Sequence, residues 1–272
     1  MSGPVHGRSA VSSESIPAPA RVFDPLLFSG VWVATAAASL TLASGRALGA
    51  TVPAAVPALA FLGTLAVYGV DRLRDLEHDS ATAPLRSAFV SRHRAALGAL
   101  ALAAGAGAAA SALAAGPGAF AIAGIVSALG LLHRRLKRLW LLKPFYVTLS
   151  WLTVTVGLPA VAATGATHVG WVAAVIGAAL HSNVIASNVR DDESLAARVG
   201  ARFALRVARA IALAGVACAA LAPLPVRPLG AVPLAMAAAL VRFRSGERYG
   251  LGVVDGALIV GAAVALVAGL NP

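Results

Sequence analysis

Three aspartates, Asp71, Asp75 and Asp79, stand four residues apart in the segment YGVDRLRDLEHDS, at the end of an apolar stretch. On a helix each step of four residues advances only about 40° around the axis, so this spacing predicts that the three carboxylates share one face. Such anions repel one another unless a cation compensates them. Oxygen ligands at this spacing suit Mg²⁺, which is commonly completed by water or by substrate phosphates. The alternative is a solvated helix end whose acids pair with Arg72, Arg74 and neighbouring loops.

A second acidic cluster follows a later apolar stretch. The segment SNVRDDES, residues 187–194, carries Asp191, Asp192 and Glu193. Together with Glu77, the two clusters hold seven of the eleven acidic residues of the chain. Basic loops are predicted around both clusters, and Lys and Arg bind phosphate oxygens strongly. The sequence therefore predicts one combined site that holds metal ions and a polyanion.

The elements that position these clusters are predicted to be membrane-spanning helices. The chain is 59% hydrophobic and 12% charged, with a mean hydropathy of +0.82. Its apolar stretches have about the length that a helix needs to cross a hydrocarbon core, roughly 20 residues. The sequence thus predicts an all-α integral membrane protein with nine transmembrane helices in a bundle. The predicted spans are 26–45, 51–70, 95–115, 117–133, 145–164, 169–187, 203–222, 228–243 and 251–270.

The positions of Lys and Arg predict the orientation of the bundle. Of the 22 such residues, 20 lie in the N-terminal tail or in loops that follow even-numbered spans. Only Arg46 and Arg227 lie on the other side of the predicted bundle. By the positive-inside rule, the N-terminus and both acidic clusters face the cytoplasm and the C-terminus lies outside the cell membrane. Residues 1–22 are predicted to be a disordered cytoplasmic tail, followed by a single membrane domain at 23–272. The net charge of +11 is explained by these loops, so no nucleic acid is expected as a partner.

These features resemble a known family, the UbiA superfamily of intramembrane prenyltransferases. DRLRDLEHD, residues 71–79, is similar to the first motif of the family, N-D-x-x-D-x-x-x-D, at the end of the second of nine helices. SNVRDDES is similar to the N-x-R-D-x-E opening of its second motif. LKRLWLLKPFYVTLSW, residues 136–151, resembles the approach to the fifth helix.

The chain departs from the family pattern at both motifs. Asp71 and Arg72 stand where the first motif usually has Asn and Asp. The second motif normally continues to another Asp four residues on, but Leu195 or Ala196 occupies that place.

The resemblance implies a Mg²⁺-dependent enzyme that transfers an isoprenyl group from a prenyl diphosphate to a lipophilic acceptor, aromatic or quinone-precursor in type. It implies a bundle, surrounded by membrane lipid, with a central cavity that opens to the cytoplasmic side. The isoprenoid tail would lie inside the bundle and the diphosphate at its mouth. The implied catalytic and metal-binding residues are Asp71, Asp75, Asp79, Asn188, Asp191 and Asp192. The implied diphosphate-binding bases are Lys137, Arg138 and Lys143, with Arg86 and Arg190 as further candidates.

Aromatic and polar residues near the motifs are candidates to line the substrate site. Aromatic faces stabilise a cation, and polar residues inside a span usually face the bundle interior. Alternatively, the aromatic residues belong to an interfacial belt and the polar ones bond neighbouring helices. Asp255 is either a site carboxylate or a partner of Arg248. The candidate lining residues are Tyr68, Tyr146, Trp151, His181 and Asn183.

Two other functions fit the same residues. A terpene cyclase of the same superfamily would ionise a prenyl diphosphate in the same way and needs no acceptor. A non-catalytic lipid-binding or transport protein would explain the missing acid of the second motif. The three retained carboxylates of the first motif favour an enzyme, because clustered anions are electrostatically costly to keep without a ligand.

Overall fold

Helices are the only regular elements in the part of the chain that the structure describes. The computed structural model describes residues 22–136, 142–191 and 194–269, without the side chains of 78–79, 81, 131–136 and 194. The all-helical prediction is confirmed for this part. The predicted tail, apart from Val22, lies outside it. In chain order the helices are α2 (Asp24–Ser29), α3 (Val31–Ala47), α4 (Ala55–Arg74), α5 (Leu76–Thr82), α6 (Pro84–Arg92), α7 (Arg94–Ala115), α8 (Pro117–Leu136), α9 (Lys143–Leu152), η1 (Thr153–Gly157), α10 (Leu158–Ala162), α11 (Val169–Arg190), α12 (Ser194–Val199), α13 (Ala201–Leu221), η2 (Leu224–Gly230), α14 (Ala231–Val241), η3 (Tyr249–Val254) and α15 (Asp255–Ala268).

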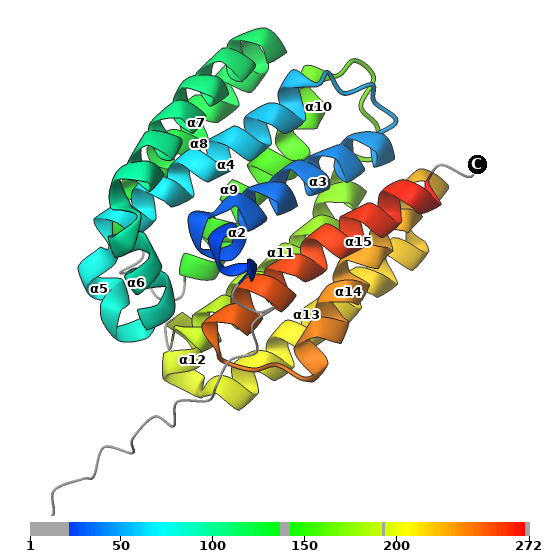
Figure 1. The fold of residues 1–272 in the computed structure, drawn as a ribbon. Helices are drawn as coiled ribbons and strands as arrows, with labels where there is room; N and C mark the ends of the chain where they lie inside the picture. The colour runs from blue at the N-terminus through cyan, green and yellow to red at the C-terminus, as the bar shows by residue number, and fades with distance from the viewer. Residues whose placement is uncertain (1–21, 137–141, 192–193, 270–272) are drawn as a thin grey trace, which may run out of the picture.

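The long helices lie side by side as a bundle (Figure 1). The short helices α5, α6 and α12 lie at one end of it, and α10 lies at the other end with the C-terminal end of α15. Three long elements are continuous across changes of helix type. Helix α9 runs through the π-helical turn η1 into α10. The 3₁₀ segment η2 runs into α14, and the π-helical turn η3 runs into α15. Such π-helical turns inside α-helices are frequent at functional sites.

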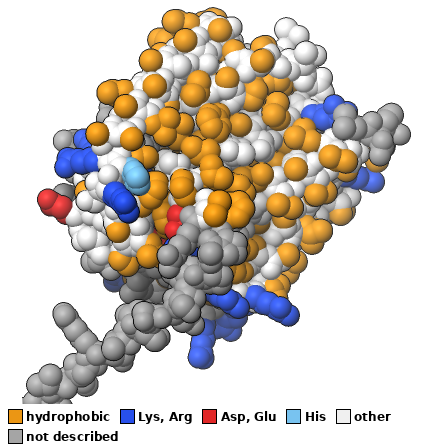
Figure 2. Space-filling view, in the orientation of Figure 1, with side chains coloured by type: hydrophobic (Ala, Val, Ile, Leu, Met, Phe, Trp, Pro, Cys, Tyr) orange, Lys and Arg blue, Asp and Glu red, His pale blue; other side chains and the backbone are white. Residues whose placement is uncertain are grey.

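Many of these helices have the length and composition of membrane spans. Large apolar side chains cover the outside of the bundle; Leu102, Leu113 and Leu221 are 78%, 69% and 77% exposed. Figure 2 shows hydrophobic side chains over most of one face, with Lys and Arg near its edges. Helix α3 has 17 residues and the apolar part of α8 is Pro117–Gly130, so the nine-span count stays a prediction. Among the described residues, seven segments are long and apolar enough to cross a membrane: Ala55–Arg74, Arg94–Ala115, Lys143–Ala162, Val169–Arg190, Ala201–Leu221, Leu224–Val241 and Tyr249–Ala268.

The first predicted span is divided in the structure. Helix α2 ends at Ser29, and Gly30 has a φ of 92°, a left-handed conformation that glycine adopts without a steric penalty. The chain then begins α3 with a new direction. By contrast, the predicted boundary at Gly116 is where α7 ends and α8 begins at Pro117. Proline suits the first turn of a helix because its missing N–H has no partner to lose there.

Glycine allows some of the helices to pack closely. A Cβ on Gly261 of α15 would lie 2.5 Å from the Cα of Val232 on α14. On α4, a Cβ on Gly69 would lie 2.9 Å from the Cβ of Ala101 on α7. Small residues at such crossings let two backbones approach, which is a common way of packing helices in membranes.

Arginine side chains donate hydrogen bonds to carbonyl groups at the C-terminal ends of two helices. Arg46 donates to the carbonyl oxygen of Gly269 after α15, from Nε at 3.0 Å and Nη2 at 2.6 Å. Arg209 of α13 donates to the carbonyl oxygen of Leu240 near the end of α14, at 2.9 and 2.7 Å. The last carbonyl groups of a helix have no partner within it and carry the negative end of its dipole. These bases therefore hold neighbouring helices together in addition to any contact with lipid.

Candidate functional site

A pocket lies at the end of the bundle where α4 and α11 end and where α9 begins. Its walls also include residues of α3, α5, α6, η3 and α15. Among the described residues of its lining, acids and bases occur in equal number, so their formal charges cancel. The charged lining residues are Asp71, Asp75, Asp191 and Asp255, and Arg72, Arg86, Lys143 and Arg190.

The pocket brings together many residues that the sequence proposed for a site. They come from positions more than a hundred residues apart in the chain, and the two acidic motifs contribute to the same pocket. Asp79 has its side chain outside the described residues, and Asp192, Lys137 and Arg138 lie outside them entirely. The proposed residues that line the pocket are Asp71, Asp75, Asp191, Arg86, Lys143, Arg190, Tyr68, Trp151 and Asn183.

Three proposed residues lie outside the pocket lining. Asn188 is buried on α11, and its Nδ2 has no hydrogen-bond partner within the described ranges. Tyr146 is partly buried on α9. His181 joins α11 to α9: its Nδ1 lies 3.0 Å from the Oγ1 of Thr148, and its ring lies 4.9 Å from that of Phe145. The contacts of His181 are therefore those of a residue that bonds two helices.

The first motif does not lie on one continuous helix, which corrects the prediction that a single helix carries all three aspartates. Helix α4 ends at Arg74, Asp75 stands at its C-cap with φ −99° and ψ 11°, and α5 begins at Leu76. The N–H of Asp75 still donates to the carbonyl oxygen of Asp71 at 2.9 Å. Asp is a poor residue inside helices because its side chain competes for backbone hydrogen bonds. Even so, Asp71 and Asp75 both face the pocket.

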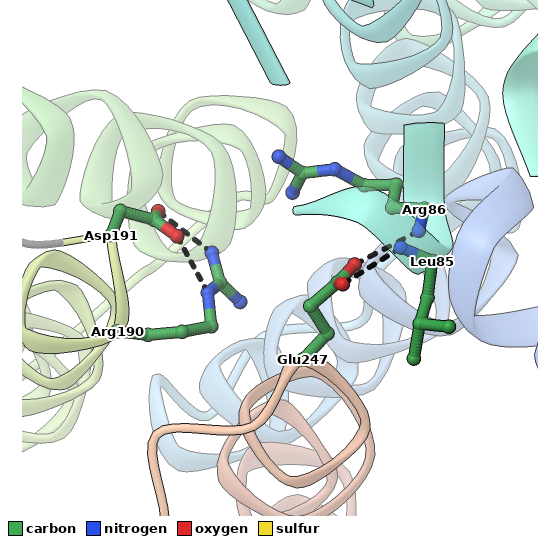
Figure 3. A network of polar contacts seen from close by, with 5 residues as sticks. All are labelled: Leu85, Arg86, Arg190, Asp191 and Glu247. Atoms are coloured by element: carbon green, nitrogen blue, oxygen red, sulfur yellow. Dashed lines mark hydrogen bonds and ion pairs between the residues drawn. The ribbon is translucent and has the colours of Figure 1, made fainter. Parts of the chain in front are cut away.

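In the second motif, Asp191 is engaged by its neighbour Arg190. The guanidinium donates from Nε and Nη2 to the two carboxylate oxygens, at 2.8 Å each (Figure 3). Burial opposes the charge of Asp191, but the hydrogen bonds and the charge of Arg190 outweigh it, and the pKa of Asp191 is lowered. Both oxygens of this carboxylate are therefore committed to a base in this conformation.

Glu247 holds the start of α6 at the pocket, a role that the sequence did not suggest. Its two carboxylate oxygens accept the backbone N–H groups of Leu85 and Arg86 at 2.9 Å each. These are two of the N–H groups that a helix leaves without an internal partner. Figure 3 shows the Arg86 side chain running away from Glu247, toward the side where Arg190 and Asp191 lie. The sequence held one local sign that α6 needs a cap from elsewhere. Ala83, the residue before α6, has no side chain that could cap it.

Arg72, a second residue that sequence reasoning did not assign to the site, is buried at the pocket wall. It donates from Nη1 to the carbonyl oxygens of Leu27 and Phe28, the unsatisfied end of α2. Its guanidinium also lies 5.9 Å from the centre of the Tyr68 ring, in a cation–π contact. Tyr68 in turn meets Trp151 edge to face, with ring centres 6.4 Å apart. Base and aromatic residues thus form one packed wall.

Asp255 lines the pocket and does not pair with Arg248. Its Oδ1 accepts a hydrogen bond from Nδ2 of Asn183 at 2.8 Å, and the residue is 6% exposed. Arg248 instead donates to both oxygens of Asp24 at 2.8 Å each. The alternative that the sequence left open is therefore decided in favour of a carboxylate in the pocket.

The donor set suits only some kinds of metal ion. Within the described residues, no group of three or more His, Cys, Asp or Glu side chains could enclose one. Mg²⁺, however, usually keeps several waters and is bound by one or two carboxylates together with substrate phosphates. Asp71 and Asp75, which both line the pocket, fit a Mg²⁺ ion that arrives with a phosphate ligand. A second ion at Asn188 and Asp191 fits less well, because Asn188 lies outside the lining and Arg190 engages Asp191.

Comparison with known proteins identifies no relative: no family model, no curated protein and no solved structure matches the chain. The resemblance to the UbiA superfamily therefore rests on the sequence alone, on the segments 71–79, 136–151 and 187–194.

Proposed function

We propose that this protein is a membrane-embedded, Mg²⁺-dependent enzyme that transfers an isoprenyl group from a prenyl diphosphate to a lipophilic acceptor. One observation carries the proposal: acids and bases from both motifs line a single pocket at the end of an apolar bundle. A prenyl diphosphate combines a polar, multiply charged head with a long apolar tail. The charged end of the pocket matches the head, and the apolar helices match the tail.

The charge balance of the lining supports a metal–diphosphate ligand over a free anion. A diphosphate ester alone is strongly anionic, and the described part of the lining, with four acids and four bases, offers it no net attraction. With Mg²⁺ bound, the head group is close to neutral and presents charges of both signs. Asp71 and Asp75 would then meet the metal, and Arg86 and Lys143 the phosphate oxygens.

Several groups in the pocket assist the breaking of the bond between the diphosphate and the allylic carbon. When bound, Mg²⁺ neutralises negative charge on the leaving diphosphate. Arg86 and Lys143 stabilise the same charge, and their fixed positions require little reorganisation. Tyr68 and Trp151 present aromatic faces to the cation and keep water from it.

The proposal also includes the membrane arrangement. The bundle would cross the cell membrane nine times, with the N-terminus and the pocket on the cytoplasmic side. The support is the excess of Lys and Arg at the ends predicted to face the cytoplasm. A cytoplasmic pocket would receive a soluble diphosphate head and Mg²⁺ from the same compartment.

The test is diphosphate release by the purified protein in detergent, with geranyl, farnesyl and geranylgeranyl diphosphates, with and without Mg²⁺. Asp75→Asn removes one carboxylate charge from the lining, and Asp24→Asn makes the same change at an acid that pairs with Arg248 outside it. We expect Mg²⁺-dependent release by the wild type and Asp24→Asn, and at least a hundredfold loss in Asp75→Asn. A prenylated lipid would identify a transferase, and a cyclic hydrocarbon a cyclase.

Absence of release from every chain length, even with bacterial membrane extract added as a source of acceptors, would contradict the proposed function. It would favour the non-catalytic alternative. Equal release by Asp75→Asn and the wild type would contradict the assignment of the pocket.

A further inference from the structure

Asp255 and Asn183 form a second polar level in the pocket, deeper than the charged mouth. On α11, Asn183 precedes Arg190 by seven residues, which corresponds to about 10 Å along the helix axis. Its hydrogen bond to Asp255 places that carboxylate at the same depth. The apolar residues of the same lining include Val33 and Leu258. A carboxylate so far inside a membrane span is costly and is by default a candidate functional group.

The partner of Asp255 is unusual for a buried acid. Buried carboxylates in membrane spans normally pair with a base. Here the donor is the neutral amide of Asn183, and within the described ranges no other hydrogen bond reaches the carboxylate. The amide fixes one oxygen in place. The second oxygen of Asp255 remains able to accept a proton or a hydrogen bond from a molecule in the pocket.

The other groups in the described lining are already engaged in ways that disfavour this role. Asp71 and Asp75 are assigned to the metal. Asp191 is bound by Arg190 through both oxygens. His181, which could serve as a base, lies outside the lining and contacts Thr148. Among the carboxylates of the described lining, Asp255 is therefore the one with neither a hydrogen-bonded base nor a metal assigned to it.

We propose that Asp255, positioned by Asn183, accepts the proton that leaves when the prenyl cation is consumed. This inference rests on the proposed function. The carbon–oxygen bond of the prenyl diphosphate breaks, and its electron pair leaves with the diphosphate. A new bond then forms from an acceptor atom to the allylic carbon, and the hydrogen of the acceptor leaves as a proton. The Asp255 carboxylate takes this proton and becomes neutral. If the cation instead cyclises, the proton lost from carbon goes to the same group.

The inference also describes the acceptor. A molecule that reaches Asp255 lies below the diphosphate, between apolar side chains, and its hydrogen faces a carboxylate. This favours an acceptor with an acidic hydrogen, such as a phenol or an enol, because a carboxylate accepts its hydrogen bond in the ground state.

The test compares diphosphate release with product formation, because the two depend on different groups. The wild type, Asp255→Asn, Asp255→Glu and the control Asp24→Asn are incubated with Mg²⁺, bacterial membrane lipid extract and geranylgeranyl diphosphate labelled in its prenyl chain. We expect Asp255→Asn to release diphosphate within threefold of the wild type. Its label should appear as prenyl alcohol, with transferred or cyclised product reduced by about 10²-fold or more, the usual contribution of a general base. Asp255→Glu should restore part of the product.

Two results would overturn the inference while leaving the proposed function intact. One is an unchanged ratio of product to released diphosphate in Asp255→Asn. The other is a parallel loss of release and product in both Asp255 variants, which would assign Asp255 to the structure of the bundle. Absence of release by the wild type would overturn the proposed function and this inference with it.

Discussion

The carboxylate of Glu247 accepts the backbone N–H of Arg86 at 2.9 Å, across 161 positions of sequence. The hydrogen bond joins the helical residues just before η3 to the first turn of α6, and Arg86 lines the pocket from that turn. A residue near the last span thus sets the position of a base near the second. The pocket depends on contacts of this kind as much as on the motif residues themselves.

Removal of this cap should destabilise the protein. Glu247→Ala leaves the N–H groups of Leu85 and Arg86 without their acceptor, and loss of a side-chain helix cap typically costs about 0.5–2 kcal/mol. Glu247→Gln should cost less, because its amide oxygen can still accept one of the two bonds. The free energy of unfolding in detergent, from a denaturant titration, checks both values. The control is Glu77→Ala, an exposed acid of α5. Equal stability of Glu247→Ala and Glu77→Ala would show that the cap contributes nothing.

A methyl group at the crossing of α14 and α15 should be poorly tolerated. Gly261→Ala places its Cβ 2.5 Å from the Cα of Val232, a backbone atom that cannot rotate away. Overpacking of this kind typically costs about 1–3 kcal/mol of unfolding free energy. Gly124→Ala on α8 is the matched control, since no atom lies within 4 Å of its Cβ position. There the higher helix propensity of Ala should leave stability unchanged or raise it by up to about 1 kcal/mol. A cost at Gly124 as large as that at Gly261 would contradict the close crossing.

Because of the ion pair between Arg190 and Asp191, the free energy of unfolding should decrease at low pH. The folded pKa of Asp191 lies below its ordinary value of 3.8. An acid with a lowered pKa stabilises the folded state above its unfolded pKa, and that contribution is lost as the pH falls through the folded value. The wild type should therefore exceed Asp191→Asn in unfolding free energy by a constant amount from pH 7 to about pH 5. The difference should shrink below pH 4. A difference that grows on acidification would mean that the pKa is raised.

The sequence was informative where local chemistry decides the structure. Hydropathy indicated the long apolar helices, because a helix that crosses a hydrocarbon core needs about 20 predominantly apolar residues. The charged motifs were recognisable because acids are rare in this chain, and Asp71 and Asp191 do line one pocket. The boundary at Gly116 followed from the conformational properties of glycine and proline.

Other features depend on contacts between distant parts of the chain and leave no local signal. The carbonyl groups that Arg72 caps belong to α2, about 45 residues earlier. Arg248 pairs with Asp24 from the opposite end of the chain. The break at Gly30 interrupts a stretch whose hydropathy suggests a continuous helix, and the end of α4 at Arg74 interrupts a helix that the aspartate spacing suggested. Hydropathy predicts that a segment is helical and apolar, but the partner of each buried charge is decided by how the helices assemble.

The central claim, that the balanced charges of the pocket hold a Mg²⁺–diphosphate ligand, is tested most directly by binding. Isothermal titration of the protein in detergent with geranylgeranyl thiolodiphosphate, which resists ionisation, measures affinity apart from catalysis. With Mg²⁺ present we predict saturable binding at one site, weakened at least tenfold in Asp75→Asn and unchanged in Asp24→Asn. Without Mg²⁺ we predict at least a tenfold loss of affinity for the wild type. Equal affinity with and without Mg²⁺, or equal affinity for the wild type and Asp75→Asn, would contradict the account.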